Sequence, residues 1–449
     1  MPLNQDESNK EKLANTAFIS EKIKQRPVNR KKLLRRTVIT ISLAVVFGIV
    51  ACFTFLLLQP VFSDKLYPEK EPETVSFPEE SASEELTPEK MFADDNEIAA
   101  VEAMSLEANQ KDQIDQAIAE YAFTSYDYSQ MMASLKNVAT DASRSIVQVT
   151  AITSDTNWFS SSYESSGSTS GLIVADSGNY YYILVHANAV AEAESIDVTF
   201  CDNTKSQAYI KLNDSTTGLC VLTLRKSSLP LETRERIMPA TLGSSNTNSF
   251  TGLPVIAIGN PIGVQGSISY GIVTSEKKTI DLPDSAYKLI TTDINGSSLG
   301  SGVIINLRGQ VIGLIDMSRR PEDLSDNICA IGITELKPLI EDLSNGKSRA
   351  FLGIHGTTVP MDIQESQNIP AGAYVIKTEM SSPAMRAGIQ SGDIITAVGD
   401  DVIISYEQLI SKLAQFSPDD IITVTVMRQA PTDYIDMQIE VTLSSSTYN

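Results

Sequence analysis

The stretch LPVIAIGNPIGVQGSISYGIVTS, residues 253–275, decides the fold class. It holds two short runs rich in β-branched residues, 254–259 and 269–275, separated by Asn, Pro and Gly, which favour turns. Such runs are typical of neighbouring antiparallel strands. Similar runs, separated by turn residues, recur from residue 143 to residue 317. This density of short strands predicts a closed all-β architecture, with a Ser-rich loop over 160–170.

A second unit begins after the turn residues Ser344, Asn345 and Gly346. Its strand-like runs alternate with two short helical patterns, one of them near 405–414. This mixture over 349–445 predicts a small α+β module. The chain is therefore expected to be multidomain.

The N-terminal region carries an apolar run, TVITISLAVVFGIVACFTFLLL, residues 37–58, with no charged side chain. As a helix, its 22 residues would measure about 33 Å, enough to cross a bilayer core. We expect a transmembrane helix over 37–59. A cleaved signal peptide is the alternative, but its apolar core is normally shorter, at about 7–15 residues, and ends in a small-residue cleavage site.

The charges around this run predict its orientation. Residues 1–36 carry a net charge of +6, whereas residues 61–130 carry −14. Because positive charge stays on the cytoplasmic side, 1–36 is expected to be a cytoplasmic tail and the bulk of the chain to be extracytoplasmic at the cell membrane. Residues 60–130 form an acidic linker too polar to bury a core, with a predicted helix over 94–121 that is either solvated or an oligomer contact.

The overall composition excludes several classes of function. The net charge of −21 disfavours nucleic acid as a partner, since phosphates would be repelled. Two histidines and no C-x-x-C pair predict no metal site and no cofactor. Cys201, Cys220 and Cys329 lie outside the apolar run. A Cys201–Cys220 disulfide is one alternative, and buried free thiols are the favoured one.

Several segments, in order, resemble a known family. GSTSGLIV (167–174), YYILVHANAV (181–190), LNDSTTGLCVLTL (212–224), the opening stretch, and TTDINGSSLGSGVIINLRGQVIGL (291–314) resemble the trypsin-like domain of HtrA/Deg-type serine proteases. RAFLGI (349–354) and SSPAMRAGIQSGDIITAVGD (381–400) resemble their PDZ domain. The resemblance implies a trypsin-like double β-barrel over 131–345, a PDZ domain over 349–445, and a homo-oligomer, usually a trimer.

The catalytic positions depart from the family pattern. Alignment on these segments places Asn188 at the His position, Gly218 at the Asp position and Gly300 at the Ser position. An Asn amide does not titrate near neutral pH, and glycine supplies neither a nucleophile nor a partner for imidazole. Loss of one triad member typically lowers the rate about 10⁴-fold, so we predict an inactive protease homologue.

Neighbouring residues offer an alternative triad of His186, Asp214 and Ser301, with Ser301 as a displaced nucleophile. A two-residue shift along a strand moves a side chain by about 6–7 Å, beyond the hydrogen-bond reach of about 3 Å. The plain interpretation is that His186 ends a buried strand, Ser301 is a turn residue and Asp214 is a solvated carboxylate. An oxyanion-like turn of Ser298 and Gly300 could remain, because its donors are backbone amides.

The PDZ resemblance places a carboxylate-binding loop at Phe351, Leu352, Gly353 and Ile354, which would receive a peptide C-terminus as an added strand. Leu409 and Leu413 would face this groove from the helix near 405–414, or form plain core. The first hypothesis is therefore an inactive protein that binds extracytoplasmic peptides or protein C-termini in envelope quality control or scaffolding. The others are an active serine endopeptidase using Ser301 and a purely structural spacer.

Overall fold

A computed structural model gives the fold. It describes residues 38–39, 41–47, 50, 73–78, 122–155, 163–246, 250–321, 326–367, 369–430 and 433–448. The chain divides into two units, 1–71 and 72–449, and the second holds both barrels and the C-terminal module. Most of the predicted transmembrane helix 37–59, and the predicted helix 94–121, lie outside the described residues. Among the described residues, no helix is both long and apolar enough to span a membrane.

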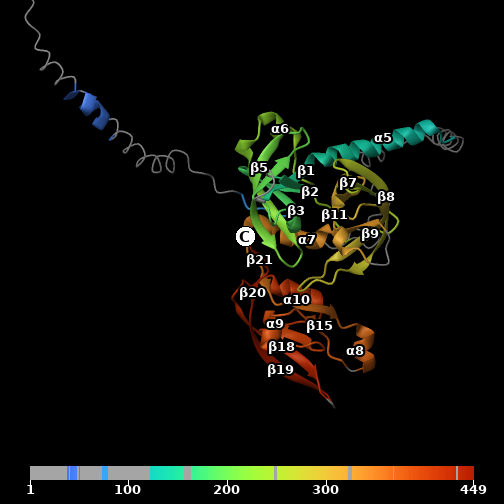
Figure 1. The fold of residues 1–449 in the computed structure, drawn as a ribbon. Coiled ribbons are helices and arrows are strands. Elements are labelled where there is room, and N and C mark those ends of the chain that lie inside the picture. The colour runs from blue at the N-terminus through green and yellow to red at the C-terminus, as the bar shows by residue number, and fades with distance from the viewer. Residues whose placement is uncertain are drawn as a thin grey trace, which may run out of the picture. The chain divides into compact units, whose positions relative to one another are not determined.

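The first barrel follows the strand order β5-β4-β1-β2-β3-β6, and a further β5–β6 pairing closes it (Figure 1). Alternating apolar residues point into its core, where Val149, Ile183 and Leu222 are fully buried. Its strands are β1 (Ile146–Asp155), β2 (Tyr163–Asp176), β3 (Tyr180–His186), β4 (Ser195–Thr199), β5 (Lys205–Asp214) and β6 (Leu219–Arg225).

The second barrel is closed in the order β10-β11-β12-β9-β8-β7. One core cluster joins the two barrels, since Leu172 and Leu184 of the first pack with Ile256 and Val303 of the second. The strands are β7 (Pro254–Asn260), β8 (Ser267–Thr279), β9 (Lys288–Asn295), β10 (Ser301–Ile305), β11 (Val311–Ile315) and β12 (Asn327–Gly332).

Helices pack around the barrels. Helix α5 (Ser125–Ala142) begins at Thr124, whose side chain forms a capping box with Asp127. The short helix α6 (Leu231–Arg236) follows β6, and α7 (Ile333–Asn345) buries an apolar face in the shared core. The backbone of Val75 exchanges two hydrogen bonds with the Asn345 side chain, so part of the acidic segment lies against the end of α7.

The C-terminal module contains a sheet in the order β14-β15-β16-β18-β19, with β17 paired to β16. Its core includes Leu352, Val375 and Leu409. Its strands are β14 (Ile354–Thr358), β15 (Ala373–Thr378), β16 (Ile394–Val398), β17 (Asp401–Val402), β18 (Ile421–Gln429) and β19 (Tyr434–Thr442). Its helices are α8 (Met361–Gln367), α9 (Pro383–Ala387) and α10 (Tyr406–Leu413).

The C-terminal tail ties this module to the first barrel. Strand β13 (Ala350–Phe351) pairs with β20 (Ser444–Ser445), and β21 (Thr447–Tyr448) pairs with the end of β5. The Ser446 carbonyl also accepts hydrogen bonds from the amide and hydroxyl of Ser215, at 2.8 and 2.7 Å. The C-terminal tail therefore holds the β5–β6 turn of the first barrel.

The predicted double barrel and α+β PDZ fold are confirmed. The prediction of a Ser-rich loop was wrong over 163–170, because β2 starts at Tyr163 and pairs with β1 from there to Leu172. Polar side chains there conceal the strand pattern. Helix α5 starts within the 60–130 segment and crosses residue 131. Cys201, Cys220 and Cys329 are free thiols, with Cys201 exposed and the other two buried.

Candidate functional site

The positions that alignment assigns to a catalytic His and Asp are neighbours in space. Asn188 lies in a 3₁₀ turn, Ala187–Ala189, directly after β3, and its side chain is exposed. Gly218 lies in the β5–β6 turn with a left-handed φ of +71°. The Ala187 amide donates to the Gly218 carbonyl at 2.8 Å. The barrel thus brings together the two backbone positions that alignment assigns to His and Asp.

The Gly300 position leaves little room for a nucleophile. A Cβ built on Gly300 would lie 2.7 Å from the Pro261 carbonyl oxygen and 2.9 Å from that of Ser297. Contacts this short are essentially never seen for real Cβ atoms, so a serine here would require the backbone to shift.

The predicted oxyanion-like turn is closed in this structure. The Gly300 amide donates to the Ser297 carbonyl at 2.8 Å, and the Leu299 amide donates to Ser297 Oγ at 3.2 Å. Ser298 is exposed beside them. In this conformation the Gly300 N–H, one of the two proposed donors, points into the turn rather than toward a reacting oxygen.

The residues of the alternative triad each bind elsewhere. His186 Nε2 donates to the Ile315 carbonyl at 2.9 Å. Ser301 is buried at the start of β10, and its Oγ accepts from the Ser170 amide at 3.0 Å. Each of these two side chains is therefore hydrogen-bonded to a backbone group in a strand of the other barrel.

Asp214 is fully buried, so its interpretation as a solvated carboxylate was wrong. Its Oδ2 accepts from the Thr217 amide and hydroxyl at 2.8 and 2.7 Å, while Oδ1 is buried with no hydrogen-bond partner among the described residues. Asp214 and His186 both pair with Leu219 from opposite sides of β6. Their backbones are thus about 9.5 Å apart, two strand spacings. The structure does not assemble these residues into a triad.

The loop predicted to bind a carboxylate runs from β13 into β14. Leu352 and Ile354 are fully buried, and Gly353 has a left-handed φ of +83°, a conformation in which successive loop amides can converge on one acceptor. Those amides already hold a carboxylate from the same chain. Asp284, in the β8–β9 loop, accepts from Leu352 and Gly353 at 2.7 Å each and from Ile354 at 3.0 Å. Sequence patterns could not reveal a contact across about 70 residues.

The groove beside the loop is also filled. Leu409 and Leu413 are buried in the module's core, which supports the core interpretation of these residues. Tyr406, at the start of α10, lies instead against β14, and its hydroxyl donates to the Ile354 carbonyl at 3.1 Å. Sequence reasoning missed Tyr406. In the structure Gly356 makes room for the ring, since a Cβ there would lie 2.6 Å from Tyr406 Cε2.

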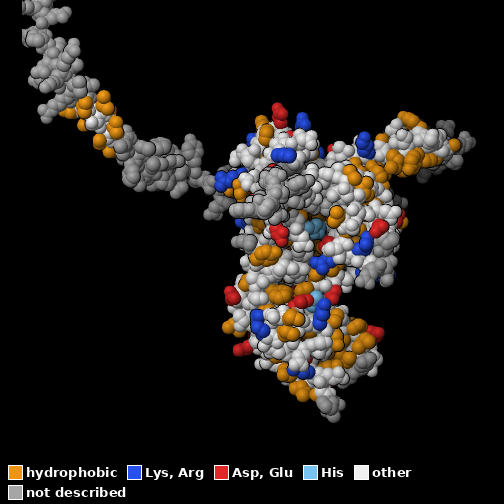
Figure 2. Space-filling model, in the orientation of Figure 1, with side chains coloured by type: hydrophobic (Ala, Val, Ile, Leu, Met, Phe, Trp, Pro, Cys, Tyr) orange, Lys and Arg blue, Asp and Glu red, His pale blue; other side chains and the backbone are white. Residues whose placement is uncertain are grey.

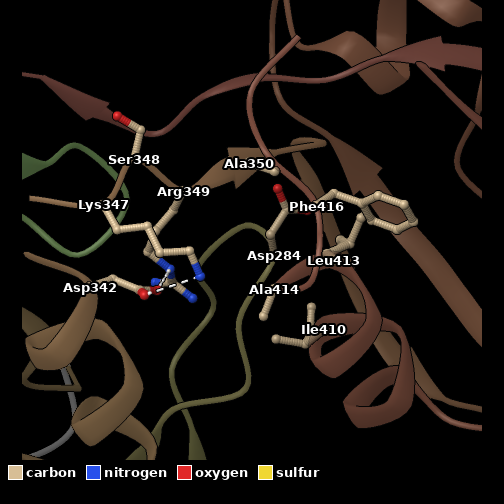
Figure 3. A pocket seen from close by; sticks show the side chains of 10 residues that line it. All are labelled: Asp284, Asp342, Lys347, Ser348, Arg349, Ala350, Ile410, Leu413, Ala414 and Phe416. Carbon is tan, nitrogen blue, oxygen red and sulfur yellow. Dashed lines mark ion pairs between the residues drawn. The ribbon is translucent and has the colours of Figure 1, made fainter. Parts of the chain in front are cut away.

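A small pocket lies behind the loop, between the domain connection and α10 (Figure 3). The close-up shows Arg349 paired with Asp342, whose carboxylate lies 3.4 Å from its Nε. Asp284 faces the same pocket from the barrel side. The complete lining is Asp284, Asp342, Lys347, Ser348, Arg349, Ala350, Ile410, Leu413, Ala414 and Phe416.

Comparisons with known proteins match this architecture. Residues 169–314 match the trypsin-like peptidase domain family, and residues 350–441 match the PDZ domain family. The chain is 30 % identical over 301 residues to the serine protease Do-like HtrA of Bacillus subtilis, covering 61 % of this chain and 64 % of that protein.

A second relative, a probable periplasmic serine endoprotease DegP-like of Rhizobium meliloti, is 26 % identical over 276 residues, covering 60 % of this chain and 52 % of its own. The chain thus spans about half the length of several curated relatives it matches. A solved structure of a variant of the HtrA-type protease AlgW with a tripeptide is 22 % identical, covers 69 % of this chain and 97 % of its own, and has a TM-score of 0.50, which shows the shared fold. With its trypsin-like double barrel and its PDZ module, the chain has the domain architecture of the HtrA-type proteases that it matches.

Proposed function

We propose that this HtrA-type protein is catalytically inactive and binds extracytoplasmic peptides or protein C-termini through its PDZ domain, in envelope quality control or scaffolding. The observation that carries the proposal is Gly300, where backbone oxygens crowd the position of a nucleophile. In addition, Asn188 and Gly218 stand at the positions assigned to His and Asp, so neither a base nor its partner is present there. No residue at these positions can remove the proton from a serine hydroxyl near neutral pH.

The peptide-binding half of the proposal rests on the three converging amides of Leu352, Gly353 and Ile354. Their ability to hold a carboxylate is seen with Asp284. Charge-assisted hydrogen bonds of this kind are about twice as strong as neutral ones, so the loop suits a peptide's terminal carboxylate.

We further propose that residues 37–59 anchor the chain in the cell membrane as a single-pass helix, with 1–36 cytoplasmic and the bulk extracytoplasmic. The uncharged run and the flanking charges support this arrangement. The relative of Rhizobium meliloti that is named as probably periplasmic supports the compartment.

A homo-oligomer is also part of the proposal. Phe123, Tyr126, Tyr128 and Met131 are all exposed at the N-terminal end of α5. Figure 2 shows hydrophobic side chains gathered along this helix. A second copy of the chain that covers this surface would remove it from water.

The alternative, a serine endopeptidase using Ser301, needs a hydroxyl that is free to attack and near a base. Ser301 Oγ is instead buried and accepts from Ser170. A fluorophosphonate probe, which phosphonylates activated serines, tests the point on the full chain. We expect no adduct by mass spectrometry. An adduct on Ser301 that disappears in Ser301→Ala would replace this proposal with the endopeptidase.

A further inference from the structure

Asp284 occupies the position that a peptide terminus would take in the PDZ loop. One carboxylate accepts three backbone hydrogen bonds, two at 2.7 Å and one at 3.0 Å. Three converging N–H donors are the arrangement by which a backbone concavity holds an anion. The aspartate side chain therefore satisfies the loop as a C-terminal carboxylate would.

The Asp284 backbone also forms a hydrogen bond of the kind that a bound peptide would form. Its own amide donates to the Ile354 carbonyl at 2.8 Å, the kind of main-chain pairing by which an added strand binds a sheet edge. This pose requires a left-handed φ of +49°. Such a conformation is unfavourable for most residues, by about 1–2 kcal/mol, and Asp is among those that tolerate it. The bonds to the loop offset this strain.

Neighbouring contacts hold the same loop against the PDZ module. Asp281 binds His355 Nδ1 and lies 3.2 Å from Lys377 Nζ. His355 is buried, and its other ring nitrogen is 2.6 Å from a carboxylate oxygen of Glu379. The β8–β9 loop is thus attached at two points, Asp281 and Asp284, on either side of Leu282 and Pro283.

Tyr406 closes the groove beyond the loop. Its hydroxyl shares the Ile354 carbonyl with the Asp284 amide, and its ring covers the backbone at Gly356. The Tyr406 amide and the Glu407 carboxylate both bind Thr358 Oγ1, at 2.9 and 2.7 Å, which fastens α10 to β14. An incoming peptide strand would have to displace both Asp284 and the Tyr406 ring.

We propose that Asp284 is a tethered ligand of the PDZ site, so that a peptide C-terminus binds only when it displaces this carboxylate from the loop. The inference rests on the proposed peptide-binding function and adds its regulation. Tethering gives Asp284 a high effective concentration, of order mM for a short connection. The apparent affinity for a free peptide is then the intrinsic affinity multiplied by the fraction of molecules whose site is open.

The test compares the full chain in mild detergent with two variants. Asp284→Asn keeps the side-chain shape and a residue type that tolerates left-handed φ, but removes the charge. Asp419→Asn is the matched control, because Asp419 also has a left-handed φ, of +70°, and is exposed away from the loop. The probes are fluorescein-labelled heptapeptides ending in Ala, Val, Leu or Phe, each as a free acid and as a C-terminal amide, measured by fluorescence anisotropy.

We expect at least one free-acid peptide to bind Asp284→Asn at least about tenfold more tightly than it binds the wild type or Asp419→Asn, with the amide forms binding weakly. Equal affinity of the acids for all three proteins would overturn the tethered ligand and leave peptide binding intact.

Hydrogen exchange separates the two ideas if no peptide binds. The amides of Leu352, Gly353 and Ile354 should exchange at least about tenfold faster in Asp284→Asn than in the wild type or Asp419→Asn. That result without peptide binding would retain Asp284 as the occupant and reject the proposed peptide function. Unchanged exchange in Asp284→Asn would overturn the tethered ligand.

Discussion

The Ala187 amide donates a 2.8 Å hydrogen bond to the Gly218 carbonyl, which joins the backbone on which the base would sit to the turn that would orient it. In the proposed inactive protein, the first barrel keeps the backbone frame of a triad, while Asn188 and Gly218 supply none of its chemistry. The third position, Gly300, differs, since its surroundings are closed to a side chain. The proposed loss of catalysis thus has a backbone origin at one position and a side-chain origin at two.

Restoring the triad residues should affect stability unequally. Asn188→His is expected to be nearly neutral because the site is exposed, whereas Gly218→Asp should cost about 1 kcal/mol for its left-handed φ. Gly300→Ser should cost about 1–3 kcal/mol, since its Cβ would meet backbone oxygens. Chemical denaturation measures each. The matched control is Gly167→Ser, where no atom lies within 4 Å of the added Cβ; an equal cost for it and Gly300→Ser would contradict the crowding.

Ser301→Ala should lower stability without altering any proteolytic rate. The substitution leaves the buried Ser170 amide without its 3.0 Å acceptor, which costs about 1–3 kcal/mol. Denaturant unfolding gives the change. A variant as stable as the wild type would show that this bond between the barrels contributes nothing.

Asp281 should make part of the stability dependent on pH. Burial alone would raise the pKa of this carboxyl, but hydrogen bonds and charge from His355 and Lys377 outweigh burial and hold the pKa below its ordinary 3.8. Its contribution is therefore present above that value and is lost as pH falls through the lowered pKa.

The measurement is the difference in melting temperature between the wild type and Asp281→Asn across this range. The side chain is 67 % exposed, so the difference should be small, on the order of 1 °C at neutral pH, and vanish in acid. A difference in melting temperature that grows as the pH falls would contradict the predicted direction of this pH dependence.

The exposed surface of α5 should determine oligomeric state. Light scattering is expected to give a multiple of the monomer mass for the wild type and a smaller mass for a Phe123→Lys, Tyr126→Lys double variant, because two charges would be buried in the contact. Tyr209→Lys, at a tyrosine 62 % exposed on β5, is the control and should leave the mass unchanged. A monomeric wild type would refute the assembly.

The sequence predicted the architecture because short β-branched runs and turn residues are local signals. Strand β7 coincides with the quoted run 254–259, and β8 contains the run 269–275. Strand β5 was missed, since Lys205–Asp214 alternates polar residues with few apolar ones and takes its place through pairing with β4 and β6.

The candidate site was predictable only in its positions. Alignment places Gly300 and the PDZ loop along the chain, but no pattern indicates that Asp284 fills that loop or that Ser301 binds Ser170, which is 131 residues away. Such contacts depend on how the barrels and the PDZ module pack together. The burial of Asp214 has the same origin, since β21 pairs with its strand from the far end of the chain.

Degradation of unfolded casein by the purified full chain, alongside Ser301→Ala, tests the central claim most directly. The account predicts that neither protein cleaves casein, because Asn188, Gly218 and Gly300 supply no base, no partner and no nucleophile. Cleavage by the wild type that Ser301→Ala abolishes would contradict it, and would require the buried Ser301 hydroxyl to leave Ser170 and reach a base.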